Sequence, residues 1–258
     1  MEKGLIDLKV SDSIARIELN DPENFNILTE PLKEELIDCL KSLDSDGSVK
    51  VFILTGRGKA FCAGGDIRGF KRRYEDWHRS GGAPPYYDNR LAHAIHGISK
   101  PIIAAINGPA IGGGLSLVLA CDIRIASEKA SFNAAYLRMG LTPEIGSSFT
   151  LPRLIGLGKA FELVMTAKDI DAYEAEKIGL VNRVVPEDKL QQTAKQMAEI
   201  ISRYSLVAIK MAKKALRYGI ESDLKDSIDY ETQLITYCFS TKEHYEAVKR
   251  FLDKRRKK

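Results

Sequence analysis

The hydrophobic residues of this chain follow two kinds of spacing, one typical of buried strands and one typical of amphipathic helices. Short, uninterrupted apolar runs at 51–54 and 102–106 have the length of buried strands, and 181–185 is predicted as a further strand. From about residue 29 to 43, apolar residues recur every three or four positions, which is typical of an amphipathic helix. Thr29 stands at the start of that segment and is a suitable N-cap. The pattern therefore predicts strands that alternate with helices.

The alternation continues to about residue 186. Further strands are predicted at 5–10, 13–19 and 122–126, and further helices at 88–98, 115–120, 149–154 and 172–179. Residues 71–87 contain many turn-forming residues, so we expect an irregular loop there. That loop is either a lid over a substrate site or a disordered surface insertion.

The last quarter of the chain has a helical pattern throughout. Helices are predicted over about 187–202, 205–219, 221–239 and 242–254. Strands that alternate with helices, followed by a helical tail, predict an α/β architecture. We expect a core over residues 1–190 and a C-terminal helical region over residues 191–258.

Two glycine-rich segments follow two of the predicted strands. Residues 61–67 read Phe-Cys-Ala-Gly-Gly-Asp-Ile, and residues 107–114 read Asn-Gly-Pro-Ala-Ile-Gly-Gly-Gly. Glycine permits the backbone to approach a ligand closely. Two such turns can direct two backbone N–H groups at one oxygen, which stabilises an enolate or a tetrahedral oxyanion. Either segment alone is equally typical of a tight turn between a strand and a helix.

The composition narrows the class of protein. The chain has 258 residues, of which 44% are hydrophobic and 29% are charged, as in ordinary soluble proteins. It has no apolar run long enough for a membrane span and no signal-peptide pattern at its start. Its four cysteines are far apart and form no C-x-x-C pair. We therefore expect a reduced, cytoplasmic protein with no structural metal.

The net charge of +4 depends largely on a basic C-terminus, residues 254–258. A basic tail can bind nucleic acid, but no recognition-helix pattern or interleaved aromatic residues accompany this one. We expect no nucleic acid as partner. The tail is either a solvated helix end or the carrier of a lysine that contacts an anionic cofactor.

The two glycine segments, in this order, resemble those of the crotonase (enoyl-CoA hydratase/isomerase) superfamily. The resemblance extends from Ile14 to Pro186 and, more weakly, through the C-terminal helices. It implies a spiral of ββα units whose last helices assemble homotrimers or dimers of trimers. It also implies an enzyme with an acyl-CoA thioester as substrate and no cofactor beyond the CoA moiety.

The resemblance assigns the oxyanion donors to the backbone N–H groups of Gly65 and Gly113. Gly113 also lies at the predicted start of a helix over 113–120, where the helix dipole favours negative charge. Hydratases of the superfamily place two glutamates around a water, and this chain has Ser116 and Tyr136 at those positions. A serine cannot serve as a carboxylate base, and tyrosine titrates near pH 10 in model peptides. We expect Ser116 and Tyr136 to line the substrate pocket instead.

Glu144 is the candidate acid/base. Residues 141–152 resemble Δ3,Δ2-enoyl-CoA isomerases, some of which carry a single catalytic acid at the position of Glu144. One carboxylate is sufficient for an isomerase, because it can take a proton from C2 and return it at C4. The alternative for Glu144 is a carboxylate that caps the helix predicted near residue 149.

For the CoA moiety, the resemblance implies contacts from the first glycine segment, the loop before the first long helix and the basic tail. The expected residues are Asn24, Phe25, Ala63, Gly64, Gly65, Asp66, Ile67 and Lys254. Lys254 matches a lysine that binds CoA phosphates, often across a subunit boundary. We also expect the Asp66 side chain to hold the turn through hydrogen bonds to the backbone.

Three functions remain open. Isomerase chemistry at Glu144 is the first, and an enoyl-CoA or cyclic-dienoyl-CoA hydratase or hydrolase with an unconventional partner for Glu144 is the second. The third is a non-catalytic CoA-binding homologue.

His93 and His96 share a helix face, but no third ligand accompanies them, so no metal site is expected. Cys62 has no recognisable base partner and is expected to be a packed side chain.

Overall fold

The computed structural model describes residues 4–83 and 86–256. Within them, a six-stranded sheet has the order β1-β2-β3-β4-β6-β9. Its strands are β1 (Ile6–Ser11), β2 (Ile14–Leu19), β3 (Val51–Gly56), β4 (Ile102–Ile106), β6 (Ile123–Ser127) and β9 (Arg183–Val185). β1 and β2 form an antiparallel pair, and the later pairs are parallel. Parallel neighbours need crossover connections, which is why helices separate these strands along the chain.

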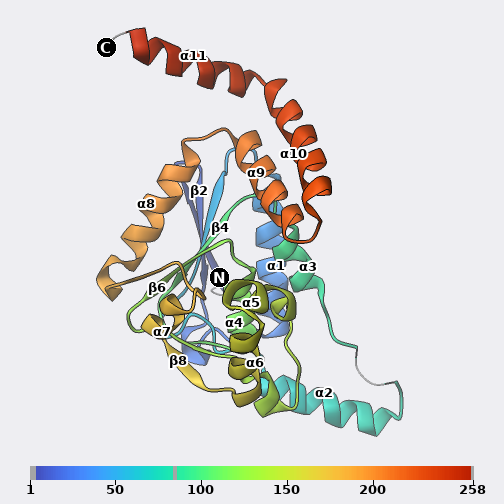
Figure 1. The fold of residues 1–258 in the computed structure, drawn as a ribbon. Coiled ribbons are helices and arrows are strands. Elements are labelled where there is room, and N and C mark those ends of the chain that lie inside the picture. The colour runs from blue at the N-terminus through green and yellow to red at the C-terminus, as the bar shows by residue number, and fades with distance from the viewer. Residues whose placement is uncertain (1–3, 84–85, 257–258) are drawn as a thin grey trace.

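The two faces of this sheet have separate cores. α1 (Glu30–Ser45), α3 (Arg90–Gly97) and α4 (Gly113–Ala120) contribute to the larger core on one face, together with alternate residues of the strands. Thr29 caps α1, with its hydroxyl accepting from Leu32 N. α8 (Leu190–Ser202) lies across the other face, where its buried side chains pack against Ile53 and Ile103 (Figure 1). Burial on both faces explains the continuous apolar runs of β3 and β4.

A second, three-stranded sheet supports the second glycine segment. It has the order β5 (Ala110–Ile111), β7 (Ser131–Asn133) and β8 (Asp169–Asp171). The N–H of Gly112 donates to the carbonyl of Asn133 over 2.9 Å. The sequence did not predict these strands, because two or three residues are too few to display a period.

The expected irregular loop over 71–87 is largely wrong. α2 (Ile67–Ser80) occupies most of it and ends at Gly81, which has φ of +66°. α2 buries none of its residues, and Figure 1 shows it extending outward from the core. Ile67, Phe70, Tyr74 and Trp77 do recur at helical spacing along it, but the turn-forming residues from Arg79 onward favoured a loop. The ion pair Lys71–Glu75 also stabilises its turns.

The chain between β7 and α8 contains several short helices. They are the 3-10 helix η2 (Ala135–Met139), α5 (Ser147–Ile155), α6 (Leu157–Thr166), α7 (Ala172–Lys177) and the 3-10 helix η3 (Glu187–Lys189). α6 was not predicted from the sequence. Its buried residues Ala160, Leu163 and Val164 do have helical spacing, but Gly156 and Gly158 at its start are typical of a loop.

The predicted helical C-terminus is confirmed as α9 (Leu206–Gly219), α10 (Leu224–Phe239) and α11 (Lys242–Arg256). α9 is joined to the core by Lys213, whose ammonium group donates to Asp122 and to the carbonyl of Lys100. α10 packs against α9, and α10 and α11 then lead away from the core (Figure 1). Among residues 4–83 and 86–256, none of the helices combines the length and apolar character that a bilayer span requires.

Candidate active site

The two glycine segments lie against each other. The N–H of Ile111 donates to the carbonyl of Cys62 over 3.1 Å, and a Cβ on Gly114 would overlap that same carbonyl oxygen. Gly64 has φ of +97°, and a Cβ there would stand 2.6 Å from the carbonyl oxygen of Ile111. Glycine is therefore required at both contact positions, and the two turns form one unit.

The expected oxyanion donors belong to this unit. Gly113 is the first residue of α4, so its N–H has no acceptor within the helix. Gly65 directly precedes Asp66, the N-cap of α2. Within the described part of the chain, neither N–H donates to another backbone or side-chain group. Both donors are therefore available to a ligand.

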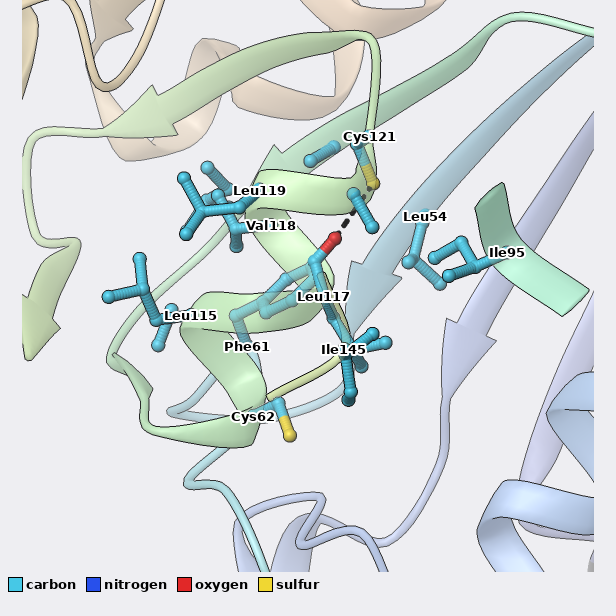
Figure 2. Close-up of a cluster of buried hydrophobic side chains, with 14 of the residues drawn as sticks. Leu54, Phe61, Cys62, Ile95, Leu115, Leu117, Val118, Leu119, Cys121 and Ile145 are labelled. Carbon is cyan, nitrogen blue, oxygen red and sulfur yellow. Dashed lines mark hydrogen bonds between the residues drawn. The ribbon is translucent and has the colours of Figure 1, made fainter. Parts of the chain in front are cut away.

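Glu144 lies in a segment with an unusual backbone. Ile145 has φ of +50°, a conformation that β-branched residues rarely adopt, and Gly146 has φ of +76°. The Ile145 side chain is 6% exposed and joins Phe61 and Cys62 in the core around α4 (Figure 2). Its carbonyl accepts a hydrogen bond of 2.9 Å from His96 Nε2, which must therefore carry the proton. Burial lowers the pKa of His96 and favours this neutral form.

The carboxylate of Glu144 faces the glycine unit. Its Oε1 atom lies 2.7 Å from the position that a Cβ on Gly113 would occupy. Its Oε2 atom accepts a hydrogen bond from the hydroxyl of Tyr87. Gly65, Tyr87 and Glu144 line one cavity of about 20 Å³. Gly146 is the N-cap of α5, so Glu144 does not cap that helix and the alternative role for it is wrong.

Ser116 and Tyr136 form a buried chain of hydroxyl groups behind Glu144. Ser116 Oγ lies 2.8 Å from the Tyr136 hydroxyl, which donates to Ser147 Oγ over 3.2 Å. Ser147 Oγ donates in turn to the backbone carbonyl of Glu144 over 2.7 Å. Burial raises the pKa of Tyr136, so the phenol stays neutral at ordinary pH. The two hydratase positions thus hold hydrogen-bonded hydroxyls that fix the Glu144 backbone.

Sequence reasoning missed Tyr87. The residue follows α2 on the segment that leads to α3, and its hydroxyl reaches a carboxylate 57 positions away in the chain. Burial, and then the hydrogen bond to Glu144, raise the pKa of Tyr87, so the phenol keeps its proton. No spacing rule connects the two positions, because only the folded chain brings them together.

The segments expected at the CoA moiety are adjacent to one another. The N–H of Ala63 donates to the carbonyl of Phe25 over 3.0 Å. Phe25 and Ile67 are exposed and lie beside the first glycine turn. The side-chain amide of Asn24, in the 3-10 helix η1 (Pro22–Asn24), donates to Asp21. An apolar, solvent-facing surface therefore adjoins Gly65.

Asp66 and Lys254 were also expected to act in this region. The Asp66 side chain makes no capping hydrogen bond and lies 3.4 Å from Arg72 Nη2, so its expected role in holding the turn is wrong. A close contact with Ile111 holds that turn instead. Lys254 lies in α11, far from α2 in Figure 1, and its side chain falls outside what the structure describes.

The weaker candidates are packed side chains. Cys62 is buried, and burial raises its pKa to about 12, so it is not a thiolate nucleophile. His96 holds the Glu144 segment, as described above. In residues 4–83 and 86–256, no group of three or more His, Cys, Asp and Glu side chains could hold a metal.

Comparisons with known proteins show the family to which the chain belongs. A family model described as enoyl-CoA hydratase/isomerase matches residues 9–258. Short-chain-enoyl-CoA hydratase from Clostridium acetobutylicum is 36% identical over 257 residues, which cover 99% of this chain and 97% of that protein. The structure of an enoyl-CoA hydratase from Bacillus anthracis is 35% identical, has a TM-score of 0.87, and matches 97% of this chain and 96% of its own. A monofunctional enoyl CoA isomerase from M. smegmatis is 38% identical, has a TM-score of 0.74, and matches 88% of this chain and 99% of its own. The chain therefore belongs to the enoyl-CoA hydratase/isomerase family of the crotonase superfamily.

Proposed function

We propose that this chain is an enoyl-CoA isomerase that moves a double bond next to the thioester. Glu144 takes a proton from C2, and the resulting enolate delocalises through C3=C4. The same carboxylate then returns the proton at C4, so that no water is consumed. The observation that carries the proposal is a lone carboxylate over Gly113, with hydroxyls at both positions where a hydratase needs glutamates.

The backbone supplies the electrostatic part of this mechanism. We place the thioester oxygen between the N–H groups of Gly65 and Gly113, which neither helix nor turn uses. One such donor contributes about 2.7–4 kcal/mol of transition-state stabilisation. The dipole of α4 adds to this at Gly113. On this proposal, the enolate charge develops beside two backbone N–H groups that make no other hydrogen bond in the described residues.

A second candidate is enoyl-CoA hydration. It is favoured by the hydratase names of the relatives from Clostridium acetobutylicum and Bacillus anthracis. Hydration needs a water held and activated beside the enoyl group, and hydratases of the superfamily use two carboxylates for this. Here Glu144 would have to act with the neutral Tyr136 or Ser116, neither of which is a base.

One experiment separates the candidates. The protein is incubated with a panel of 2-enoyl- and 3-enoyl-CoA esters in H₂O and in D₂O, and the products are followed by mass spectrometry. An isomerase interconverts the two esters and incorporates deuterium at carbon without gaining the mass of a water. Net gain of one water would overturn the isomerase proposal in favour of hydration. Binding of every ester without turnover would indicate a non-catalytic CoA-binding homologue.

For the CoA moiety, we propose contacts with residues 63–67 and with Asn24 and Phe25. The exposed apolar side chains of Phe25 and Ile67 support this, because an adenine ring can pack against them. α11 leads away from this surface (Figure 1), and we propose that Lys254 contacts the phosphates from a neighbouring subunit. We accordingly propose a homotrimer or a dimer of trimers.

A further inference from the structure

The two oxygens of the Glu144 carboxylate have different surroundings. Oε2 accepts the hydrogen bond from the Tyr87 hydroxyl, whereas Oε1 lies over Gly113. In the described residues, Tyr87 is the side chain that hydrogen bonds to this carboxylate. The carboxylate can therefore rotate freely only if that bond breaks.

Tyr87 is suited to hold one oxygen without taking part in proton transfer. A neutral phenol donates one hydrogen bond, so it occupies a single carboxylate oxygen. Its hydroxyl remains protonated because burial and the adjacent carboxylate both oppose ionisation. Tyr87 thus keeps Oε2 in a hydrogen bond and leaves Oε1 as the oxygen that can accept a proton from the substrate.

The backbone next to Tyr87 is anchored on its C-terminal side. Asp88 accepts hydrogen bonds from the backbone N–H and the guanidinium group of Arg90, at the start of α3. Arg90 also pairs with Glu34 of α1 through both terminal nitrogens. Two helices of the core therefore fix the position from which Tyr87 extends to Glu144.

The other charged side chains around the same cavity form ion pairs with residues other than Glu144. Lys33 of α1 and Arg73 of α2 line it, and both pair with Glu30. Asp88 pairs with Arg90 as described. On the inner side, Cys62 and Tyr136 are neutral, since burial raises the pKa of each. Tyr87 is thus the group whose removal changes the hydrogen bonding of Glu144 directly.

We propose that Tyr87 is a positioning residue that binds Oε2 of Glu144 and thereby presents Oε1 to the substrate as the atom that moves the proton. The inference rests on the proposed function for the identity of the reaction. The contact between Tyr87 and Glu144 does not depend on it.

The test compares Tyr87→Phe with Tyr86→Phe. Tyr86 is the adjacent residue, is 86% exposed, and provides a matched loss of one phenol hydroxyl. In Tyr87→Phe, we expect kcat on a 3-enoyl-CoA to fall about 10- to 100-fold, the effect of a hydrogen bond to a charged group. KM should change less than about threefold, because the phenol touches the carboxylate and not the CoA moiety. Tyr86→Phe should retain wild-type values.

The split between kcat and KM gives a readout that a general loss of structure would not reproduce, because a disordered site would weaken substrate binding as well. A kcat in Tyr87→Phe that matches wild type would overturn the proposal.

A second readout does not require turnover. In the ligand-free protein, the infrared carboxylate band of Glu144 is assigned by subtracting the spectrum of Glu144→Gln. We expect this band to shift in Tyr87→Phe and not in Tyr86→Phe, and an unshifted band would contradict the inference. Should wild type fail to isomerise any ester, the proposed function fails, while this band still decides whether Tyr87 holds the carboxylate.

Discussion

At the scale of the residue, the position of Glu144 depends on a strained backbone that its neighbours hold. A left-handed conformation at Ile145 costs on the order of 1–3 kcal/mol. Burial of the Ile145 side chain and the hydrogen bond from His96 to its carbonyl offset that cost. Ser147 fixes the preceding carbonyl, that of Glu144. The backbone of Glu144 is thereby fixed, and the hydrogen bond from Tyr87 then holds its carboxylate beside Gly113.

Glu144→Gln should lower kcat by a factor of about 10² to 10⁴, the usual contribution of general acid–base catalysis. Acyl-CoA binding, measured by calorimetry, should stay close to wild type, because glutamine has nearly the same size. Tyr136→Phe serves as the comparison and should have a small effect. If Tyr136→Phe is instead the damaging change, the proton passes through the phenol and the hydration alternative is favoured.

His96 makes the stability of this segment depend on pH. Its pKa is lowered in the folded protein by burial, so the unfolded chain binds the proton more readily. The contribution of neutral His96 to stability is fully present above the unfolded pKa, near pH 6.5, and is lost as the pH falls below it. Urea unfolding at pH 7.5 and 5.5 should show a smaller acid-induced loss in His96→Asn than in wild type. Equal losses in both proteins would contradict this role.

At the scale of the element, the contact between the two glycine segments decides whether two separate strand ends form one site. β3 and β4 are neighbours in the parallel sheet, so the segments that follow them emerge at the same edge. The close approach at Gly64 and Gly114 then locks them together. A Cβ on Gly64 would also lie 3.5 Å from the backbone nitrogen of Gly113, so the first residue of α4 lies beside the segment that leads into α2.

Gly114→Ala should disrupt this contact, because a Cβ would overlap the carbonyl of Cys62. We expect a loss of about 1–3 kcal/mol in the free energy of unfolding, as for overpacking in a core, together with a lower kcat. Gly158→Ala is the matched control, since nothing lies within 4 Å of its Cβ position. Urea unfolding of the two variants checks the prediction, and equal stability would show that the segments can move apart without cost.

At the scale of the whole molecule, α10 and α11 leave the core and expose apolar side chains. Leu224, Ile228, Ile235 and Phe239 of α10 are all exposed, and their spacing places them along one face of the helix. A row of this kind is unusual on a free surface and is typical of a subunit contact. It supports the proposed trimer or dimer of trimers.

Light scattering should report a trimer or hexamer at micromolar concentration. Replacing Ile228 and Ile235 together by Glu should yield smaller species with unchanged helix content, because two charges would be buried in the contact. Gln233→Glu adds a charge to another face of the same helix and should leave the assembly intact. A monomeric wild-type protein would contradict the proposal.

Local sequence patterns were sufficient to predict many of the helices and strands of this fold. The apolar runs of β3 and β4 and the periodic residues of α1, α3 and α9 each record burial of their own side chains, so they can be recognised without knowledge of partners. The glycine segments were recognisable for a related reason, because a close backbone approach admits no other residue. Glu144 was found through its resemblance to isomerases, and the structure places it over Gly113.

Other features were decided only by the tertiary structure. β5, β7 and β8 are too short to show a period, so no local pattern marks them. The apolar residues of α2 do have helical spacing, but that spacing does not reveal that the helix buries none of them. Asp66 was expected to hold its turn, but the contact with the second glycine segment already does so. The hydrogen bond from Tyr87 to Glu144 and the hydroxyl chain through Ser116 and Tyr136 join distant parts of the sequence. Side-chain identity determines what each of these groups can donate or accept, but only the packing of the folded chain determines which partner it meets.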